Sequence, residues 1–217
     1  MNPSEDITTR GIVLRVRPLT ESSLILHWIT PDYGRIATVA KGARRPKSPF
    51  RGVLDLFHEA QIGIRKSRRS SLHLLREAAL VDGHTTLRRE WLHLQQASYA
   101  AALIEQSTEE ESPLHEVYAL YSGFLGHLSN SLSGPNAMMA FELRYLDRVG
   151  LRPPLDRAGL SPGTQRILAS LSTSAWGELH RLELAPAEHA EARGFLGDFL
   201  SFHLGRVLPN RASALGE

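Results

Sequence analysis

The chain has 217 residues, of which 42% are hydrophobic and 22% charged, and its formal net charge is +2. This composition is ordinary for a globular protein and excludes wholesale disorder, a collagen-like chain and a long coiled coil. The sequence contains no cysteine, which excludes disulfides, thiolate metal sites and a cysteine nucleophile. The first ten residues are polar and no apolar run approaches ~18–20 residues, so we expect no signal peptide, no membrane span and a cytoplasmic location.

The charges are unevenly distributed along the chain. Residues 1–80 carry 14 Lys or Arg and 7 Asp or Glu, a net charge of +7, whereas residues 81–217 carry 11 basic and 16 acidic residues, a net charge of −5. No Lys or Arg occurs between Arg89 and Arg144. The separation indicates that the first third of the chain binds a polyanion, and the alternative is a set of solvated surface arginines.

The first 81 residues have the alternating pattern of short β-strands. Turn residues such as Pro31-Asp32-Tyr33-Gly34 separate the apolar runs. Five strands within residues 11–81 are typical of a small antiparallel barrel of the OB-fold type, and a two-sheet sandwich, which usually needs about seven strands, is the alternative. The predicted strands are Gly11–Leu19, Ser23–Thr30, Arg35–Ala40, Val53–Ile64 and Leu72–Val81.

Beyond residue 81 the apolar residues recur with helical spacing. The clearest stripe runs from Leu114 to Leu132, with Ser112 as a suitable N-cap and Pro113 as a suitable first residue. We therefore expect an α+β protein with a barrel domain over 1–81 and a helical domain over 82–217. A loop or short-helix insert is expected near 151–175, and the tail from Pro209 is expected to fray. The predicted helices are Thr86–Glu105, Pro113–Leu132, Pro135–Val149, Pro162–Leu171, Ser174–Leu182 and Pro186–Leu208.

Two basic clusters in the barrel domain are the candidate binding residues. One follows the third predicted strand, where Gly42 permits unusual backbone angles and Pro46 and Pro49 stiffen the loop. The other lies in the turn before the fifth strand. Tyr33 is placed to stack on a base, whereas Trp28 and Phe57 are expected in the core. The predicted nucleic-acid ligands are Arg35, Lys41, Arg44, Arg45, Lys47, Arg51, Arg65, Lys66, Arg68, Arg69 and Tyr33.

No element suited to reading base edges is predicted, so binding should tolerate any sequence. If about six of these cations contact phosphates, the logarithm of the affinity should fall with the logarithm of salt with a slope of roughly −4 for single strands and −5 for duplex.

The segment from Gly11 to Gly52 resembles the N-terminal domain of the RecO family of bacterial recombination mediators. The resemblance is carried by Glu21-Ser22, by Thr30-Pro31-x-x-Gly34, and by Ala40-Lys41-Gly42-Ala43-Arg44-Arg45 before Ser48. Two further stretches are similar to the same family, Phe141–Pro153 (FELRYLDRVGLRP) and Phe202–Leu208 (FHLGRVL). The resemblance covers essentially the whole chain and implies an OB barrel followed by a helical domain.

This resemblance implies a function in DNA repair without catalysis and without a cofactor. Members of the family bind single- and double-stranded DNA, anneal complementary strands, and act with RecR to load RecA on strands coated with SSB. They also bind the acidic, apolar C-terminal tail of SSB, which needs an apolar notch with cations at its rim. Our candidates for that rim are Arg144, Arg148 and Arg152, and the alternative is that these residues pair with Asp147 or Glu142.

The sequence departs from the family at one point. Many members carry a four-cysteine zinc module after the segment matching Gly150–Leu155, but here the stretch LRPPLDRAGLSPGTQRIL has neither Cys nor His. Zinc needs thiolate or imidazole ligands at fixed spacing, so we expect no metal and a plain loop or short helix.

Two other functions remain open on the sequence. A scaffold whose basic barrel binds an acidic protein would have the same charge separation. A metal-dependent nuclease would need clustered carboxylates, and the seven acidic residues of the first 80 show no paired motif. A membrane contact is disfavoured because no basic amphipathic helix is predicted.

Overall fold

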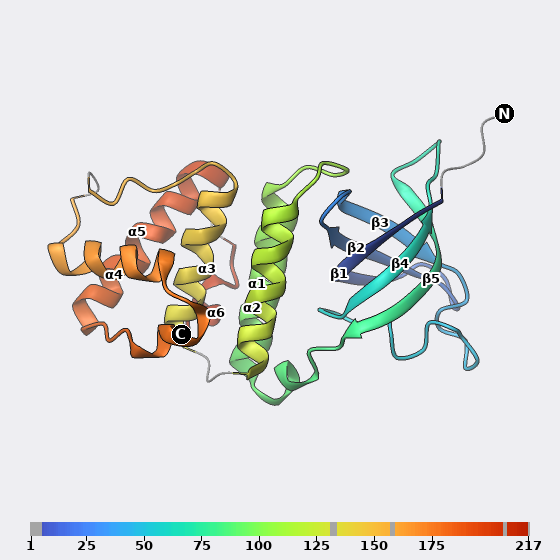
Figure 1. Ribbon diagram of the computed structural model, residues 1–217, viewed down its shortest axis with the longest axis horizontal. Coiled ribbons are helices and arrows are strands. Elements are labelled where there is room, and N and C mark those ends of the chain that lie inside the picture. Colours follow the sequence, from blue (N-terminus) through green and yellow to red (C-terminus); the bar gives the residue numbers. More distant parts are fainter. Residues whose placement is uncertain (1–5, 131–133, 157–158, 206–207, 217) are drawn as a thin grey trace. The chain divides into compact units, whose positions relative to one another are not determined.

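The computed structural model describes residues 6–130, 134–156, 159–205 and 208–216. It divides into two compact units (Figure 1). The barrel unit comprises the chain up to His84 together with Ser107–Ala119, and the helical unit comprises Thr85–Gln106 and Leu120–Glu217. The barrel unit thus includes a segment from within the predicted helical domain.

Five strands form a closed barrel, as predicted for an OB-type fold. The order around the barrel is β1-β2-β3-β5-β4, with antiparallel pairing throughout except for the parallel pair β3–β5. This arrangement makes every strand an interior one and leaves no open edge. The strands are β1 (Asp6–Pro18), β2 (Leu24–Thr30), β3 (Gly34–Ala40), β4 (Glu59–Arg65) and β5 (Leu72–Asp82).

The barrel closes around Trp28, which is fully buried. Its indole Nε1 donates a hydrogen bond of 2.8 Å to Thr38 Oγ1 on the neighbouring strand, so the one polar atom of the ring is satisfied. A Cβ at Gly11 would lie 3.1 Å from the Trp28 ring and 3.0 Å from Ile62, which explains the absence of a side chain there. The expectation that Trp28 and Phe57 belong to the core is confirmed.

The segment 107–119 packs against the barrel through backbone hydrogen bonds. The Glu111 N–H donates to the Arg35 carbonyl at 2.9 Å, and the Leu114 N–H donates to the Pro31 carbonyl at 2.9 Å. Gly34 has φ +60, and a Cβ there would overlap the Ser112 carbonyl. The β2–β3 turn therefore needs glycine both for its backbone angle and for this contact.

The prediction of a strand over Val53–Ile64 is wrong in its first half. Residues 53–57 form turns and bends, and β4 begins only at Glu59. Phe57 has a positive φ of 67 and its N–H donates to the Val13 carbonyl at 3.0 Å, so the chain turns back towards β1 instead of extending. The first strand is longer than predicted, because residues from Asp6 onward pair with β4.

The helical unit is built around stacked aromatic rings. Phe124 and Phe141 lie 4.7 Å apart between ring centroids, and Tyr145 stacks on Phe141 at 5.9 Å.

No helix among the described residues is long and apolar enough to cross a membrane. The elements that follow the barrel are η1 (Thr85–Arg89), α1 (Trp91–Ser107), α2 (His115–Asn130), α3 (Pro135–Arg148), α4 (Pro162–Thr173), η2 (Trp176–Arg181), α5 (Pro186–Leu204) and α6 (Arg211–Ala214).

Several helices begin or end at residues other than those predicted from the sequence. The helix predicted over Thr86–Glu105 is divided into the short η1 and the long α1. Ser112 and Pro113 do not start α2, which begins at His115, because the contact of Leu114 with Pro31 fixes the chain just before the helix. The short helix predicted over Ser174–Leu182 is the 3-10 helix η2. The predicted end at Leu132 lies outside the described residues. The predicted end at Leu208 is wrong, because α5 ends at Leu204, where Gly205 adopts a left-handed φ of 78.

The expectation of a frayed tail is wrong. Arg211 in α6 is 7% exposed and its guanidinium donates to both carboxylate oxygens of the fully buried Glu142, at 2.6 and 2.8 Å. Tyr99 donates to the same carboxylate at 2.7 Å. The side-chain amide of Gln96 donates to the Ala214 carbonyl at 3.0 Å. These buried contacts hold the last helix on the core of its unit.

Candidate nucleic-acid interface

The basic loop, residues 41–51, leaves the end of β3 as a chain of consecutive turns. Three backbone hydrogen bonds, each spanning three residues, close these turns: Arg45 N–H to Gly42 O at 3.1 Å, Ser48 N–H to Arg45 O at 3.0 Å, and Arg51 N–H to Ser48 O at 3.2 Å. Gly42 has φ +71, the left-handed angle that the first turn requires. The loop therefore has a defined backbone without belonging to a helix or strand.

Two contacts anchor the basic loop to the barrel. Phe50 is 6% exposed and belongs to the barrel core. The Arg44 N–H donates to the Ser22 carbonyl in the β1–β2 connection at 3.0 Å. The cationic side chains of the loop, in contrast, are exposed, and within the described residues none of them forms an ion pair with an acid: Lys41, Arg44, Arg45, Lys47 and Arg51.

A cleft of about 380 Å³ lies between the basic loop and the β1–β2 connection. Its lining includes Lys41 and Arg45 on one side and the hydroxyl-bearing Thr20, Ser22 and Ser23 on the other. Cationic side chains, hydroxyls and backbone N–H groups are the donors that proteins present to the sugar-phosphate backbone. The cleft therefore combines two cations and three hydroxyls with the apolar side chains of Leu19 and Val39.

Arg35 lies outside this surface. Its guanidinium donates to the Thr108 carbonyl at 2.6 and 3.2 Å and to the Thr108 hydroxyl at 2.8 Å. The side chain thus fastens the segment 107–119 to β3, and the structure gives Arg35 a structural contact in place of the phosphate contact expected from the sequence.

The second cluster is less available than its composition suggests. Arg65 forms a two-point ion pair with Asp6 at 2.9 and 3.2 Å, and this pair lowers the pKa of the Asp6 carboxyl. The Lys66 ammonium lies 5.0 Å from the centre of the Tyr33 ring, so one face of that ring is covered. Arg65 and Lys66 are half-buried, whereas Arg68 and Arg69 are exposed.

The two clusters leave opposite ends of β3. The basic loop follows Ala40, the last residue of the strand, whereas Lys66 lies over Tyr33 in the turn that precedes it. In Figure 1 the β4–β5 turn and the loops after β3 accordingly lie at opposite ends of the barrel. A strand that contacted both would have to run along the barrel wall.

Arg17, which is exposed on β1, was not among the nucleic-acid ligands predicted from the sequence. It pairs with Ile25, which in turn pairs with Val39, two residues before Lys41. The register therefore brings Arg17 to the end of the barrel from which the basic loop leaves. The signal was present in the polar face of the alternating first strand, but its relation to Lys41 depends on the pairing of three strands.

The three arginines proposed for the rim of a tail-binding notch have different environments. The Arg144 guanidinium donates to the Leu171 carbonyl at 2.9 Å and lies 4.2 Å from the centre of the Trp176 ring. Arg148 and Arg152 both contact Asp147, at 3.0 and 2.7 Å, which is the pairing considered as the alternative on sequence grounds.

These arginines border a cavity of about 780 Å³ in the helical unit, which we call the apolar notch. Its apolar lining comes from Leu143, Pro153, Pro154, Leu155 and Ala169. Arg144 is committed to backbone carbonyls, so the other charges of the lining come from Arg148 and Arg152 and from the acids Asp147 and Asp156.

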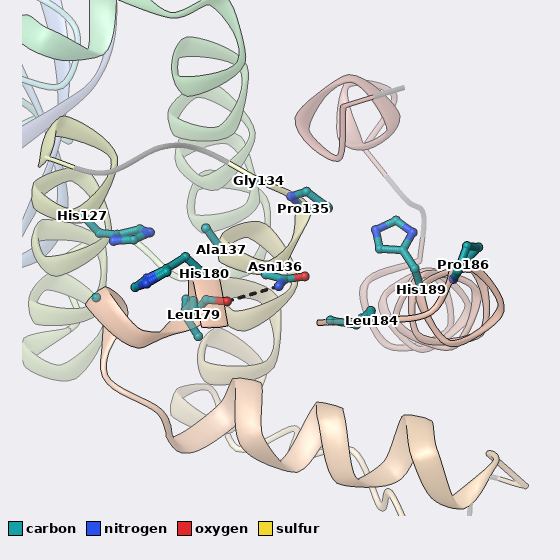
Figure 2. A pocket seen from close by; sticks show the side chains of 11 residues that line it. His127, Gly134, Pro135, Asn136, Ala137, Leu179, His180, Leu184, Pro186 and His189 are labelled. Carbon is teal, nitrogen blue, oxygen red and sulfur yellow. Dashed lines mark hydrogen bonds between the residues drawn. The ribbon is translucent and has the colours of Figure 1, made fainter. Parts of the chain in front are cut away.

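A second cavity, of about 860 Å³, has a different character. Figure 2 shows His127 and His180 on one side and His189 across from them on α5. Asn136 lies between them, and its amide donates to the Leu179 carbonyl at 3.2 Å. Burial lowers the pKa of His127 and of His189, which favours the neutral form of both side chains. No metal-binding group of three His, Asp or Glu occurs in the described part of the chain. The described residues that line this cavity include no Lys or Arg, so it differs in charge from the basic loop.

Comparison with known proteins identifies the family. The model described as "Recombination protein O N terminal" matches residues 1–84, and "Recombination protein O C terminal" matches residues 88–159. Proteins named "DNA repair protein RecO" are similar over most of the chain. The one from Anaeromyxobacter sp. (strain K) is 30% identical over 93% of this chain and 92% of its own length, and that from Myxococcus xanthus is 29% identical over 91% and 92%. The chain belongs to the RecO family of DNA repair proteins.

Proposed function

We propose that this protein is a non-catalytic recombination mediator that holds single- and double-stranded DNA by the backbone on its basic loop. The observation that carries the proposal is the set of five exposed cations on a loop whose backbone is anchored by Phe50. A preordered backbone reduces the entropy lost when cationic side chains bind phosphates. We take residues 1–81 as the DNA-binding domain and residues 82–217 as the domain that binds protein partners.

Backbone contacts alone explain binding that ignores sequence. Phosphates are the same at every position, and readout of bases needs an element that enters a groove and contacts base edges. The basic loop offers turns and cations without such an element. The same cationic surface favours annealing, because it neutralises the charge repulsion between two complementary strands without covalent chemistry.

Loading of RecA on SSB-coated single strands together with RecR completes the proposal, as family membership suggests. We accordingly propose that the protein acts in the cytoplasm, at the nucleoid. For the tail of SSB we propose the apolar notch, with Arg148 and Arg152 as its cations and Asp147 as the acid that the tail must displace. A fluorescent tail peptide should bind the native protein and should bind the Arg148→Ala/Arg152→Ala variant more weakly.

A salt titration of DNA binding tests the main proposal. With five phosphate contacts, the slope of log affinity against log salt should be about −3.5 for single strands and −4.5 for duplex. The variant Lys41→Ala/Arg44→Ala/Arg45→Ala/Lys47→Ala should lower the magnitude of the single-strand slope by roughly 3. The control is Arg166→Ala/Arg181→Ala, which removes exposed charge from the helical unit.

Two outcomes would contradict the proposal. An unchanged slope in the four-residue variant would remove the basic loop from the DNA site and favour a scaffold that binds an acidic protein. Cleavage of labelled DNA in the presence of Mg²⁺ would show an enzyme in place of a mediator. Annealing of SSB-coated oligonucleotides measures DNA binding and partner recognition together, and the four-residue variant should slow it.

A further inference from the structure

The indole of Trp91, the first residue of α1, is exposed to an unusual degree. Its side chain is 73% exposed, whereas Trp28 is fully buried and Trp176 lies against Arg144 and Phe124. Tryptophan has the largest apolar surface of any side chain, and binding surfaces are enriched in it because one ring supplies much contact area at little entropic cost. The exposure of Trp91 therefore indicates a candidate binding surface.

The ring is held in one orientation. With the Gln95 amide turned to suit both of its neighbours, its oxygen accepts a hydrogen bond of 3.2 Å from Trp91 Nε1 and its nitrogen donates to the Ser213 carbonyl at 3.1 Å. Gln95 lies one helical turn after Trp91, and Ser213 belongs to α6, whose Arg211 is paired with buried Glu142. The edge of the indole is thus satisfied, and a broad apolar face is presented to solvent.

Two exposed cations directly precede the ring. Arg88 and Arg89 form the last turn of η1, and both are exposed. The acid between them and the ring, Glu90, accepts the Leu94 N–H through its carbonyl, and its carboxylate acts on the neighbouring His93 by raising its pKa against the larger lowering caused by burial. The combination of a fixed aromatic face with adjacent arginines is the composition of sites that bind single strands.

We propose that Arg88, Arg89 and Trp91 form a second contact for single-stranded nucleic acid, in which one unpaired base stacks on the indole and the two arginines bind the flanking phosphates. The inference rests on the proposed function and deepens it, because it adds a strand-selective site on the helical unit to the sequence-tolerant basic loop. In a duplex both faces of each base are already stacked, so this site should distinguish single strands from duplex.

Tryptophan fluorescence tests the proposal on the native protein. A thymidine homopolymer should quench the emission, and the quench should be absent in Trp91→Phe, because Trp28 is buried and Trp176 is packed. Trp91→Ala should weaken binding of the homopolymer between about fivefold and about a hundredfold while changing the affinity for a blunt duplex less than about twofold. Arg88→Ala/Arg89→Ala should lower the magnitude of the single-strand salt slope by about 1.4.

The controls separate this proposal from the function on which it rests. Phe202→Ala removes an 84% exposed aromatic ring from the same unit, and Arg166→Ala/Arg181→Ala removes two exposed charges from it. Unquenched emission together with normal binding of the homopolymer by Trp91→Ala would overturn the second site while leaving the basic loop intact. Equal weakening by Trp91→Ala and Phe202→Ala, or of single strand and duplex alike, would also overturn it. If instead the four-residue loop variant binds normally while Trp91 is quenched, the proposed function fails and the second site stands.

Discussion

The arginines of the basic loop and those of the helical unit have opposite environments. Arg44, Arg45 and Arg51 are exposed, and no acid pairs with them in the described part of the chain. Arg144 donates to backbone carbonyls beside Trp176, and Arg211 lies buried against Glu142. The comparison teaches that local charge density indicates a polyanion site only where the fold leaves the charges without partners, because a partnered guanidinium contributes to stability instead.

The largest effect should come from breaking the buried pair. Arg211→Ala leaves the Glu142 carboxylate fully buried with Tyr99 as its one remaining donor among the described residues, and the free energy of unfolding should fall by about 3–5 kcal/mol. Urea denaturation measures this change. The double variant Glu142→Leu/Arg211→Met, which removes both charges, should recover part of the loss. A loss below about 1 kcal/mol from the single variant would show that the pair does not hold α6.

An intermediate effect is expected at Arg144. Arg144→Ala removes a charged donor from the Leu171 and Ser174 carbonyls and a guanidinium from the Trp176 ring, and should cost about 2 kcal/mol of unfolding free energy. Arg148→Ala is the matched control four residues on, and its more exposed ion pair with Asp147 should contribute less than about 1 kcal/mol. Equal losses in the two variants would contradict the structural assignment of Arg144.

A smaller effect depends on pH and concerns a buried histidine on which burial outweighs the opposing effect of the Glu90 carboxylate. His93 is 5% exposed, and burial lowers its pKa below the ordinary value of 6.5. The unfolded chain takes up a proton as pH falls through 6.5 while the folded protein does not, so stability is lost from pH 6.5 downward, by at most about 1.4 kcal/mol per pH unit for this group. Above that pH, His93 contributes no pH dependence.

His93→Leu isolates this contribution from those of the other histidines. The variant should be nearly as stable as the native protein at pH 7.5 and should lose less stability between pH 6.5 and 5.5, as followed by urea denaturation at each pH. The same pH dependence in both proteins would mean that His93 takes up its proton in the folded state.

The smallest effect on stability belongs to the basic loop. Arg44→Ala/Arg45→Ala should change the unfolding free energy by less than about 0.5 kcal/mol, because both side chains are exposed and the Arg44 guanidinium makes a long hydrogen bond, of 3.3 Å, to the Thr20 carbonyl. The backbone hydrogen bond from the Arg44 N–H to the Ser22 carbonyl remains in the variant. The same variant should lower the magnitude of the single-strand salt slope by about 1.4. A destabilised protein with unchanged DNA binding would show that these two loop arginines act in stability and not in DNA binding.

Much of the fold could be predicted because its signals are local. The alternation of β3, the Pro-Asp-Tyr-Gly turn and the apolar stripe of α2 each lie in one short stretch of chain, and the turns favour pairing of consecutive strands. The pairs β1–β4 and β3–β5, which close the barrel, join segments that no turn connects. The basic loop was equally visible, since its cations are neighbours in sequence. The strand wrongly expected over residues 53–58 failed because backbone contacts with Val13, some forty residues earlier, hold the chain in turns.

By itself the sequence indicated the five strands of a small barrel, the order of the helices and the cluster of loop cations, since these depend on patterns of neighbouring residues. Only the tertiary structure decided which cations remain available. Arg35 meets Thr108, Arg144 meets Leu171 and Arg211 meets Glu142, and each partner is distant along the chain. A charge shows its type in the sequence, but its free energy depends on the solvent and partners around it, which the fold alone supplies.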